Sequence, residues 1–300
     1  MPKRSDTVSG VLNVDKPSGW TSHDVVARMR GIAQQRRVGH AGTLDPMATG
    51  VLVVCLGKAT RLSEYLVQGH KRYRATIRFG LTTDTWDMDG QPLETRPLDG
   101  LSEQDLVALL PRQSGEIEQT PPMYSAIKVN GQPLHRLARK GITVERAPRR
   151  VEIHALTPIS WESPDLLLDV ECSKGTYVRS LAYDLGQLAG CGATLAALRR
   201  TAVGPFDVLQ ATPLDQLWDE RGNDGWQRHL TPLYQALAEW PRIIVGAEAL
   251  EELRFGRPAA LPISERPDMV AVFDSNRQLA AIVAPQPESE LWRPSKVFTQ

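Results

Sequence analysis

The sequence contains little cysteine and no long apolar run, and each shortage excludes a class of protein. Its three cysteines, Cys55, Cys172 and Cys191, are widely spaced and form no CxxC pair. We therefore expect neither a disulfide framework nor a zinc site. No stretch approaches the roughly 20 consecutive apolar residues that a membrane-spanning helix needs. The polar start, Met1–Asp6, does not resemble a secretory signal, so the sequence predicts a cytoplasmic chain without a membrane span.

The chain also lacks an excess of charge of either sign, because 35 Lys and Arg balance 35 Asp and Glu. The distribution is nevertheless uneven. Residues 1–80 hold 13 basic and 5 acidic residues, and residues 121–160 hold 7 basic and 2 acidic residues. Two basic segments can form one positive face that meets a phosphate backbone. The alternative is that these side chains only solvate two exposed surfaces.

What is present is the pattern of a mixed α and β protein. A length of 300 residues suits two domains. A capping box, Thr21 with Asp24, begins a segment of helical period, and a second one, Ser102 with Asp105, predicts another helix start. The segment 71–80 (KRYRATIRFG) alternates between apolar and basic residues, as a strand does. Further strands are expected at 50–57, 151–156 and 166–172, and further helices at 61–67 and 176–188.

Two segments differ in character from this core. Residues 121–150 are basic with poor apolar periodicity, which indicates an excursion that contacts a ligand. Beyond residue 240, short apolar runs separated by Gly, Pro, Asn and Asp predict a small, mostly β domain. We therefore expect an α+β protein with domains at 1–235, including the excursion, and 240–300.

The stretch GHAGTLDPMATG (39–50) is the best candidate for a catalytic loop. Pro46 biases Asp45 toward an extended backbone, and the flanking glycines allow tight turns and close approach by a ligand. An acid on such a loop, beside His40 and just before a buried strand, is well placed for a site. The alternative is an Asx-turn in which Asp45 caps its own backbone. The glycine pattern does not fit a phosphate-binding loop.

Five ordered motifs resemble those of the bacterial tRNA pseudouridine synthase B family, across roughly residues 10–205. The loop lies in the second of them, and the match is specific to this family among pseudouridine synthases. The motifs are GVLNVDKPSGWTSHDVV, GHAGTLDPMATGVLVVCLGKATRL, KRYRATIRFG with the following TDTWDMDG, QTPPMYSAIKVNGQPLHRLARKG, and CSKGTYVRSLAYDLG with the later LRRT.

The resemblance implies that Asp45 is the nucleophile for the T-loop uridine of tRNA, uridine-55. Its carboxylate attacks the nucleotide, and the base detaches, rotates and reattaches through carbon. Whether the attack is on the ring or on the sugar stays open. Arg179 is implied as the cation that holds Asp45 charged and oriented. Tyr73 is implied to stack on the base and to assist its deprotonation.

Five more residues receive implied roles in binding the substrate. His40 is expected to press into the T-loop where the uridine has left its stack. Tyr177 and Leu198 are expected to line the uracil pocket, and Arg61 to approach the RNA backbone. Asp87 matches a second acid that orients polar groups, with a simple turn acid as the alternative.

Trp86 departs from the family pattern, because it places a bulky side chain in TDTxD where a small residue is expected. The last sixty or so residues match the family only loosely.

The implied fold is the pseudouridine synthase fold, a mixed, largely antiparallel sheet flanked by helices, followed by a small barrel-like (PUA-like) RNA-binding domain. The implied enzyme is a monomeric isomerase that binds the tRNA T-stem-loop and needs no metal or other cofactor. Two alternatives are an RNA chaperone without chemistry and a hydrolase of the glycosidic bond. The first has no use for the set Asp45, Tyr73 and Arg179, and the second lacks a second general-acid carboxylate.

Overall fold

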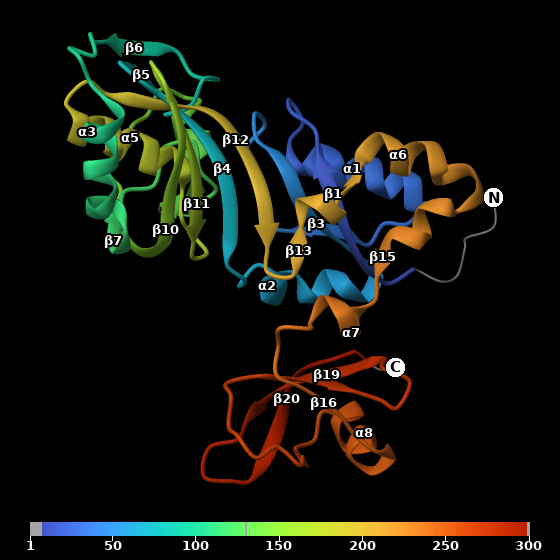
Figure 1. Ribbon diagram of the computed structural model, residues 1–300. Coiled ribbons are helices and arrows are strands. Elements are labelled where there is room, and N and C mark those ends of the chain that lie inside the picture. The colour runs from blue at the N-terminus through green and yellow to red at the C-terminus, as the bar shows by residue number, and fades with distance from the viewer. Residues whose placement is uncertain (1–7, 130, 299–300) are drawn as a thin grey trace.

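The computed structural model describes residues 8–129 and 131–298, which form a larger body and a small C-terminal β-rich body (Figure 1). One eleven-stranded sheet runs through the larger body. Its strands are β1 (Gly10–Lys16), β2 (Val38–Ala41), β3 (Thr49–Leu56), β4 (Lys71–Phe79), β7 (Gly115–Gln119), β10 (Arg149–Glu162), β11 (Asp165–Cys172), β12 (Ala193–Val203), β13 (Phe206–Asp207), β14 (Thr212–Pro213) and β15 (Leu230–Thr231).

The sheet is largely antiparallel, as predicted. Its main path is β14-β1-β3-β12-β4-β11-β10-β7, with β2 beside β3, β13 beside β12 and β15 beside β1. Among the described strand pairs of this sheet, β1–β14 and β3–β12 are parallel and the others are antiparallel. Two short hairpins lie outside it: β5 (Leu81–Thr83) with β6 (Pro92–Thr95), and β8 (Lys128–Val129) with β9 (Gln132–Pro133).

Helices flank the sheet, and two of them begin at the predicted capping signals. They are α1 (Ser22–Ala33), α2 (Ser63–Leu66), α3 (Glu103–Leu109), α4 (Leu134–Ala138), α5 (Val178–Ala189), α6 (Leu214–Asp219) and α7 (Leu233–Ala236). Both predicted capping boxes are present, at Thr21 with Asp24 and at Ser102 with Asp105. The helix expected at 61–67 is a 3₁₀ turn (Gly57–Leu62) followed by α2. In the described chain, no helix combines the length and apolarity required to cross a bilayer.

Strand β4 has the predicted alternation, but its basic side is not a free face for RNA. Tyr73, Ala75, Ile77 and Phe79 are buried. The arginines on the other side are instead paired with aspartates of neighbouring strands, which neutralises much of their charge. These ion pairs are Arg72–Asp207 (3.2 Å), Arg74–Asp169 (2.9 Å) and Arg78–Asp165 (2.7 Å).

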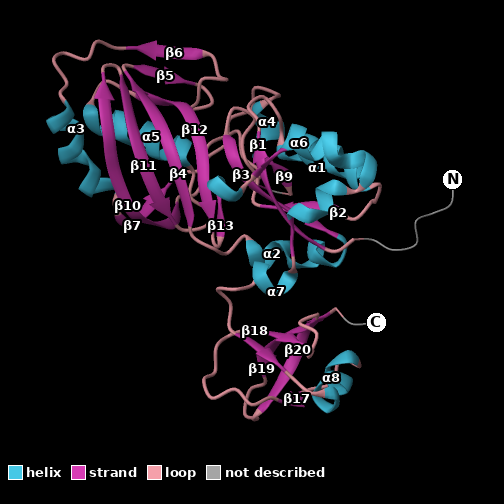
Figure 2. Ribbon diagram, turned by 45° about the vertical axis from the view of Figure 1, so that its right-hand side comes forward, coloured by secondary structure: helices cyan, strands magenta, loops and turns pink. Residues whose placement is uncertain are grey.

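Strand β12 joins the two halves of the sheet, and we did not predict it as a strand. It pairs with β4 along its length and with β3 only at Arg199–Thr49 and Arg200–Gly50 (Figure 2). Gly50 makes this approach possible. Its φ is +95°, and a Cβ at this position would lie 2.2 Å from the carbonyl oxygen of Arg200. Glycine tolerates both conditions, whereas residues with a Cβ do not.

The C-terminal body is a curled sheet of five strands in the order β16-β18-β19-β20-β17, which confirms the predicted barrel-like domain. Its elements are β16 (Arg242–Ile244), α8 (Ala247–Arg254), β17 (Ala259–Ala260), β18 (Val270–Phe273), β19 (Leu279–Pro285) and β20 (Leu291–Val297). Phe273 and Ile282 from this sheet share a buried cluster with Val51, Val53 and Cys55 of β3. The two bodies therefore pack against each other.

Candidate active site

Asp45 lies on the loop between β2 and β3, and its carboxylate faces Arg179 of α5. The Nε atom of Arg179 is 2.9 Å from Oδ2 of Asp45, and Nη2 donates to Oδ1 at 3.1 Å. The Asp45 side chain is 33% exposed, whereas that of Arg179 is 4% exposed. A buried guanidinium therefore orients a carboxylate that a ligand can reach. Because the carboxylate faces Arg179 in this way, the geometry does not favour the Asx-turn alternative.

Arg179 is itself held by three further groups. Its Nη1 donates to the carbonyl of Thr85 (3.2 Å) and lies 3.3 Å from Oδ2 of Asp87. Its Nη2 also donates to the carbonyl of Tyr124 at 2.8 Å, so the start of the basic excursion touches the ion pair. With these partners the guanidinium has one defined orientation, as a preorganised site requires.

Asp87 fits both roles that the sequence left open. As a turn acid, its Oδ1 accepts from the backbone N–H of Asp89 at 3.1 Å and from the hydroxyl of Thr85. Its Oδ2 meanwhile faces Arg179. Burial raises the pKa of this carboxyl group, against the effect of the Thr85 hydroxyl and the Arg179 guanidinium. Asp87 is 4% exposed, so it supports Arg179 without being open to a ligand.

Lys16 holds the backbone of the Asp45 loop in place. This buried ammonium donates to the carbonyls of Pro17 (2.9 Å), Trp20 (2.6 Å) and Pro46 (3.1 Å). Burial lowers its pKa to about 8, although nearby Asp45 acts in the opposite direction. Lys16 thus fixes the backbone of the residue after Asp45 and adds positive charge near the carboxylate.

Tyr73 lies on β4, next to Arg200 of β12. Burial raises the pKa of the Tyr73 phenol to about 12, although the charge of Arg200 and a hydrogen bond from it act against this rise. The phenol is therefore neutral near pH 7. Arg200 is 1% exposed and donates to the carbonyls of Gly42, Thr43 and Val51. It ties β12 and the Asp45 loop together.

Tyr177 and Leu198 lie in the same region. Tyr177 precedes α5, and its backbone N–H donates to Oε1 of the buried Gln119 at 2.7 Å. Burial raises the pKa of its phenol, against a hydrogen bond with Ser125. Leu198 is 8% exposed and belongs to the buried cluster that includes Tyr73. The charge of Asp45 acts on the phenols of both Tyr73 and Tyr177, so both rings lie near the carboxylate.

His40 lies on strand β2, outside the ion-pair network of Asp45 and Arg179. Its ring meets that of His23 edge-on at a centroid distance of 5.6 Å, and its Nδ1 is buried without a hydrogen-bond partner. Burial, together with the charges of His23 and Arg200, lowers its pKa to about 4. The ring is therefore neutral at physiological pH.

Arg61 lies on the 3₁₀ turn before α2 and contacts the C-terminal body. Its Nη1 donates to the carbonyl of Val297 at 2.5 Å, and its guanidinium lies 4.9 Å from the centre of the Phe298 ring. In the described structure these contacts engage it at the junction of the two bodies rather than with the Asp45 group.

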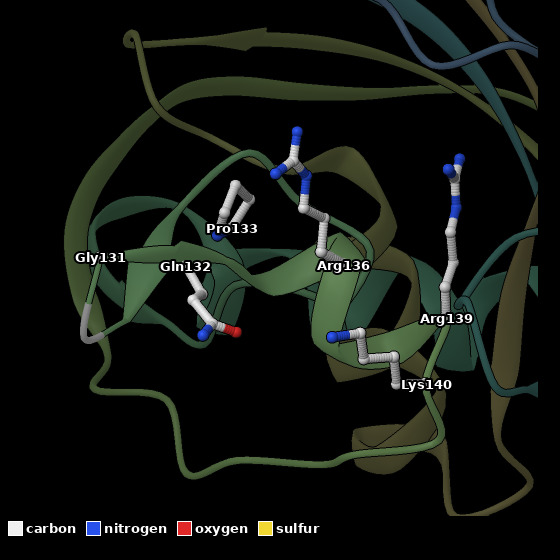
Figure 3. A pocket seen from close by; sticks show the side chains of 6 residues that line it. All are labelled: Gly131, Gln132, Pro133, Arg136, Arg139 and Lys140. Atoms are coloured by element: carbon white, nitrogen blue, oxygen red, sulfur yellow. The ribbon is translucent and has the colours of Figure 1, made fainter.

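The basic excursion carries a pocket of about 550 Å³. It is lined by Gly131, Gln132, Pro133, Arg136, Arg139 and Lys140. Figure 3 shows Arg136 and Arg139 extending in the same direction. Three cations around one hollow suit a phosphate.

Sequence reasoning assigned no role to Lys16 or Arg200, although both stand in quoted motifs. The available signal was a cation at the end of a largely apolar segment, as in VLNVDK and LAALRR. Among the described residues, no group of three or more His, Cys, Asp and Glu side chains could hold a metal ion. The expectation of a reaction without a cofactor stays a prediction.

Comparison with known proteins finds two matching family models and close relatives. Residues 30–178 match the family model described as TruB family pseudouridylate synthase (N terminal domain), and residues 179–238 match that of the tRNA pseudouridylate synthase B C-terminal domain. The tRNA pseudouridine synthase B of Ectopseudomonas mendocina is 42% identical over 92% of this chain and 90% of its own. That of Dehalococcoides mccartyi is 42% identical over 97% of both.

A solved structure shows a similar fold. The crystal structure of a Cbf5-Nop10-Gar1 complex contains a chain that is 28% identical, with a TM-score of 0.74 over 97% of this chain and 84% of that one. A structure of an H/ACA RNP bound to a substrate RNA gives a TM-score of 0.73 at 26% identity, over 97% of this chain and 85% of that one.

Proposed function

We propose how this chain acts from the premise that it belongs to the tRNA pseudouridine synthase B family. Its substrate is the T-loop uridine of tRNA, uridine-55, and its product is pseudouridine. The observation that carries the proposal is a reachable carboxylate, Asp45, fixed by the buried guanidinium of Arg179 at 2.9 Å. A protein that only binds RNA has no use for such a pair, so we rank the chaperone second.

Asp45 is the nucleophile. Its carboxylate bonds to the ring or the sugar of the uridine, and the bond between N1 and the sugar C1′ breaks. The base rotates, its C5 bonds to C1′, the bond to Asp45 is released, the C5 proton is removed by a base, and N1 takes up a proton. The reaction isomerises its substrate, so no oxidant, metal or nucleotide enters the balance. Arg179 aims the carboxylate through its contacts with both carboxylate oxygens.

The uridine must leave its stack to reach Asp45, which costs a few kcal/mol. Stacking on Tyr73 and contact with Tyr177 and Leu198 offset part of this cost, and His40 fills the vacated space. Because the Tyr73 phenol is neutral in the free protein, it can accept the C5 proton only if the bound substrate lowers its pKa.

The rest of the chain grips the tRNA. The excursion at 121–150 offers phosphate its three-cation pocket. The domain at 240–300 extends the contact, and the catalytic domain comprises 1–235. A monomer suffices, because the residues assigned to the reaction come from one chain. Cytoplasm, where tRNA is processed, is the proposed location.

The test is pseudouridine formation in an unmodified tRNA transcript, with the modified position mapped. The control substrate replaces the T-loop uridine by cytidine. Product at the T-loop position of the first transcript and none in the second supports the proposal. Tight tRNA binding without product at any position would transfer the function to the chaperone.

A further inference from the structure

Trp86 lies between two residues that hold Arg179. Its preceding residue, Thr85, offers a carbonyl to Arg179, and its following residue, Asp87, offers a carboxylate. Trp86 adopts a φ of +63°, a left-handed conformation that is uncommon for bulky residues. Something in the structure must therefore hold this turn in place.

Backbone hydrogen bonds to Leu195 of β12 hold the inner side of this turn, and the Trp86 ring adds a second hold by stacking on Tyr183. The two ring centroids are 4.3 Å apart and the planes are inclined by 18°. Tyr183 stands one helical turn after Arg179 on α5. The turn at 85–87 is thus attached to α5 at two points, internally through Arg179 and externally through Tyr183.

The same ring contacts the far end of the basic excursion. The guanidinium carbon of Arg146 lies 5.4 Å from the centre of the Trp86 ring. Arg146 also donates to the carbonyl of Pro121 at 3.1 Å, so it ties the two ends of the excursion together. Its Nε is buried without a hydrogen-bond partner, and burial lowers its pKa. Its contact with the Trp86 ring links the excursion to the turn at 85–87.

We propose that Trp86 is a positioning residue that couples the RNA-gripping excursion to the Arg179–Asp45 pair. Because Arg146, Trp86 and Tyr183 connect the excursion to α5, a tRNA held by the excursion keeps the Thr85–Asp87 turn where Arg179 needs it. This role requires no contact of Trp86 with the substrate or with Asp45. This inference rests on the proposed reaction and explains why a bulky side chain stands where a small one is expected.

The test compares Trp86→Ala, Trp86→Gly and Trp86→Phe under single turnover with saturating tRNA. Glycine relieves the strain of the positive φ but lacks the ring. We expect both Ala and Gly to slow product formation about tenfold, with tRNA binding within about threefold of wild type. Phe retains a ring and recovers most of the rate. Fast turnover by Trp86→Gly would overturn the inference, because strain rather than stacking would then be decisive.

Arg146→Ala completes a double-mutant cycle with Trp86→Ala. Coupling predicts that the two single losses overlap, so that the double variant is about as slow as either single one. Losses that multiply would contradict coupling. The matched control is Trp218→Ala, which removes a ring stacked on Arg28 (3.2 Å) and Arg221 (3.9 Å) elsewhere and leaves the rate unchanged.

Trypsin cleavage within 128–150 gives a readout independent of activity. Trp86→Ala should be cut there about tenfold faster than wild type, because the excursion has lost its anchor. If wild type makes no pseudouridine, the proposed function fails, and this readout alone decides the inference. Equal cleavage of both proteins would then sink it.

Discussion

Asp45 and Arg179 are far apart in sequence, and single side chains hold the Asp45 loop where its carboxylate meets Arg179. Lys16 fixes the carbonyl of Pro46 beside the carboxylate, and Arg200 fixes the carbonyls of Gly42 and Thr43 before it. Both cations are buried, and each bonds to backbone carbonyls. Hydrogen bonds of this kind offset the cost of removing a charge from water. The loop is therefore positioned by two buried cations.

A prediction at this scale concerns His40. Burial and two neighbouring cationic residues lower its pKa to about 4 from an ordinary 6.5. Between these values the unfolded chain binds a proton that the folded chain does not, so His40 removes stability as the pH falls from 6.5 to 4. The free energy of unfolding, measured with urea, should therefore fall less for His40→Gln than for wild type over this pH window. Parallel losses in the two proteins would show that His40 titrates normally.

At the scale of elements, the decisive feature is the short parallel contact between β3 and β12. It brings Arg200 of one strand to the loop that precedes the other. Its closeness depends on the missing side chain at Gly50.

Gly50→Ala should destabilise the protein by about 2–5 kcal/mol, through a strained left-handed residue and an overpacked contact. The matched control is Gly31→Ala in helix α1, where a Cβ would meet nothing within 4 Å. This control should gain about 0.5–1 kcal/mol from helix propensity. Chemical denaturation measures both changes. A neutral Gly50→Ala would mean that β3 and β12 are not held together at this point.

The sequence anticipated elements whose signals are local. Both capping boxes and the alternation of β4 were read correctly, because each depends on neighbours in the chain. Strand β20 was missed, since LWRPSKV has no clear alternation, and β10 is longer than expected. The pairing of the β4 arginines with aspartates, and the burial of Lys16 and Arg200, depend on partners distant in sequence. A single sequence gives no direct signal of those.

For the whole molecule, the C-terminal sheet packs on the back of β3, opposite the core that contains Tyr73. Lys296 adds to this junction by donating to the carbonyl of Arg61 at 2.9 Å and pairing with Glu64. The orientation of the small domain is thus tied to the sheet that carries the catalytic loop.

Arg61→Ala tests whether this arginine serves the junction or the RNA. Its contacts with Val297 and Phe298 predict a loss of about 0.5–1.5 kcal/mol in thermal stability. The dependence of tRNA affinity on salt should stay unchanged. Arg139→Ala, from the basic pocket, should reduce the salt slope by about 1 without loss of stability. A smaller salt slope for Arg61→Ala would place it on the phosphate backbone.

The most direct test is the single-turnover rate of Asp45→Asn on a tRNA transcript. The variant keeps the side-chain shape, and Asp87 still faces Arg179, so the fold and tRNA binding should persist. The control is Asp89→Asn, an exposed acid nearby, which should retain the wild-type rate. We expect Asp45→Asn to form pseudouridine at least about a thousandfold more slowly, with unchanged tRNA affinity. Formation at the wild-type rate would contradict the assignment of Asp45 as the nucleophile.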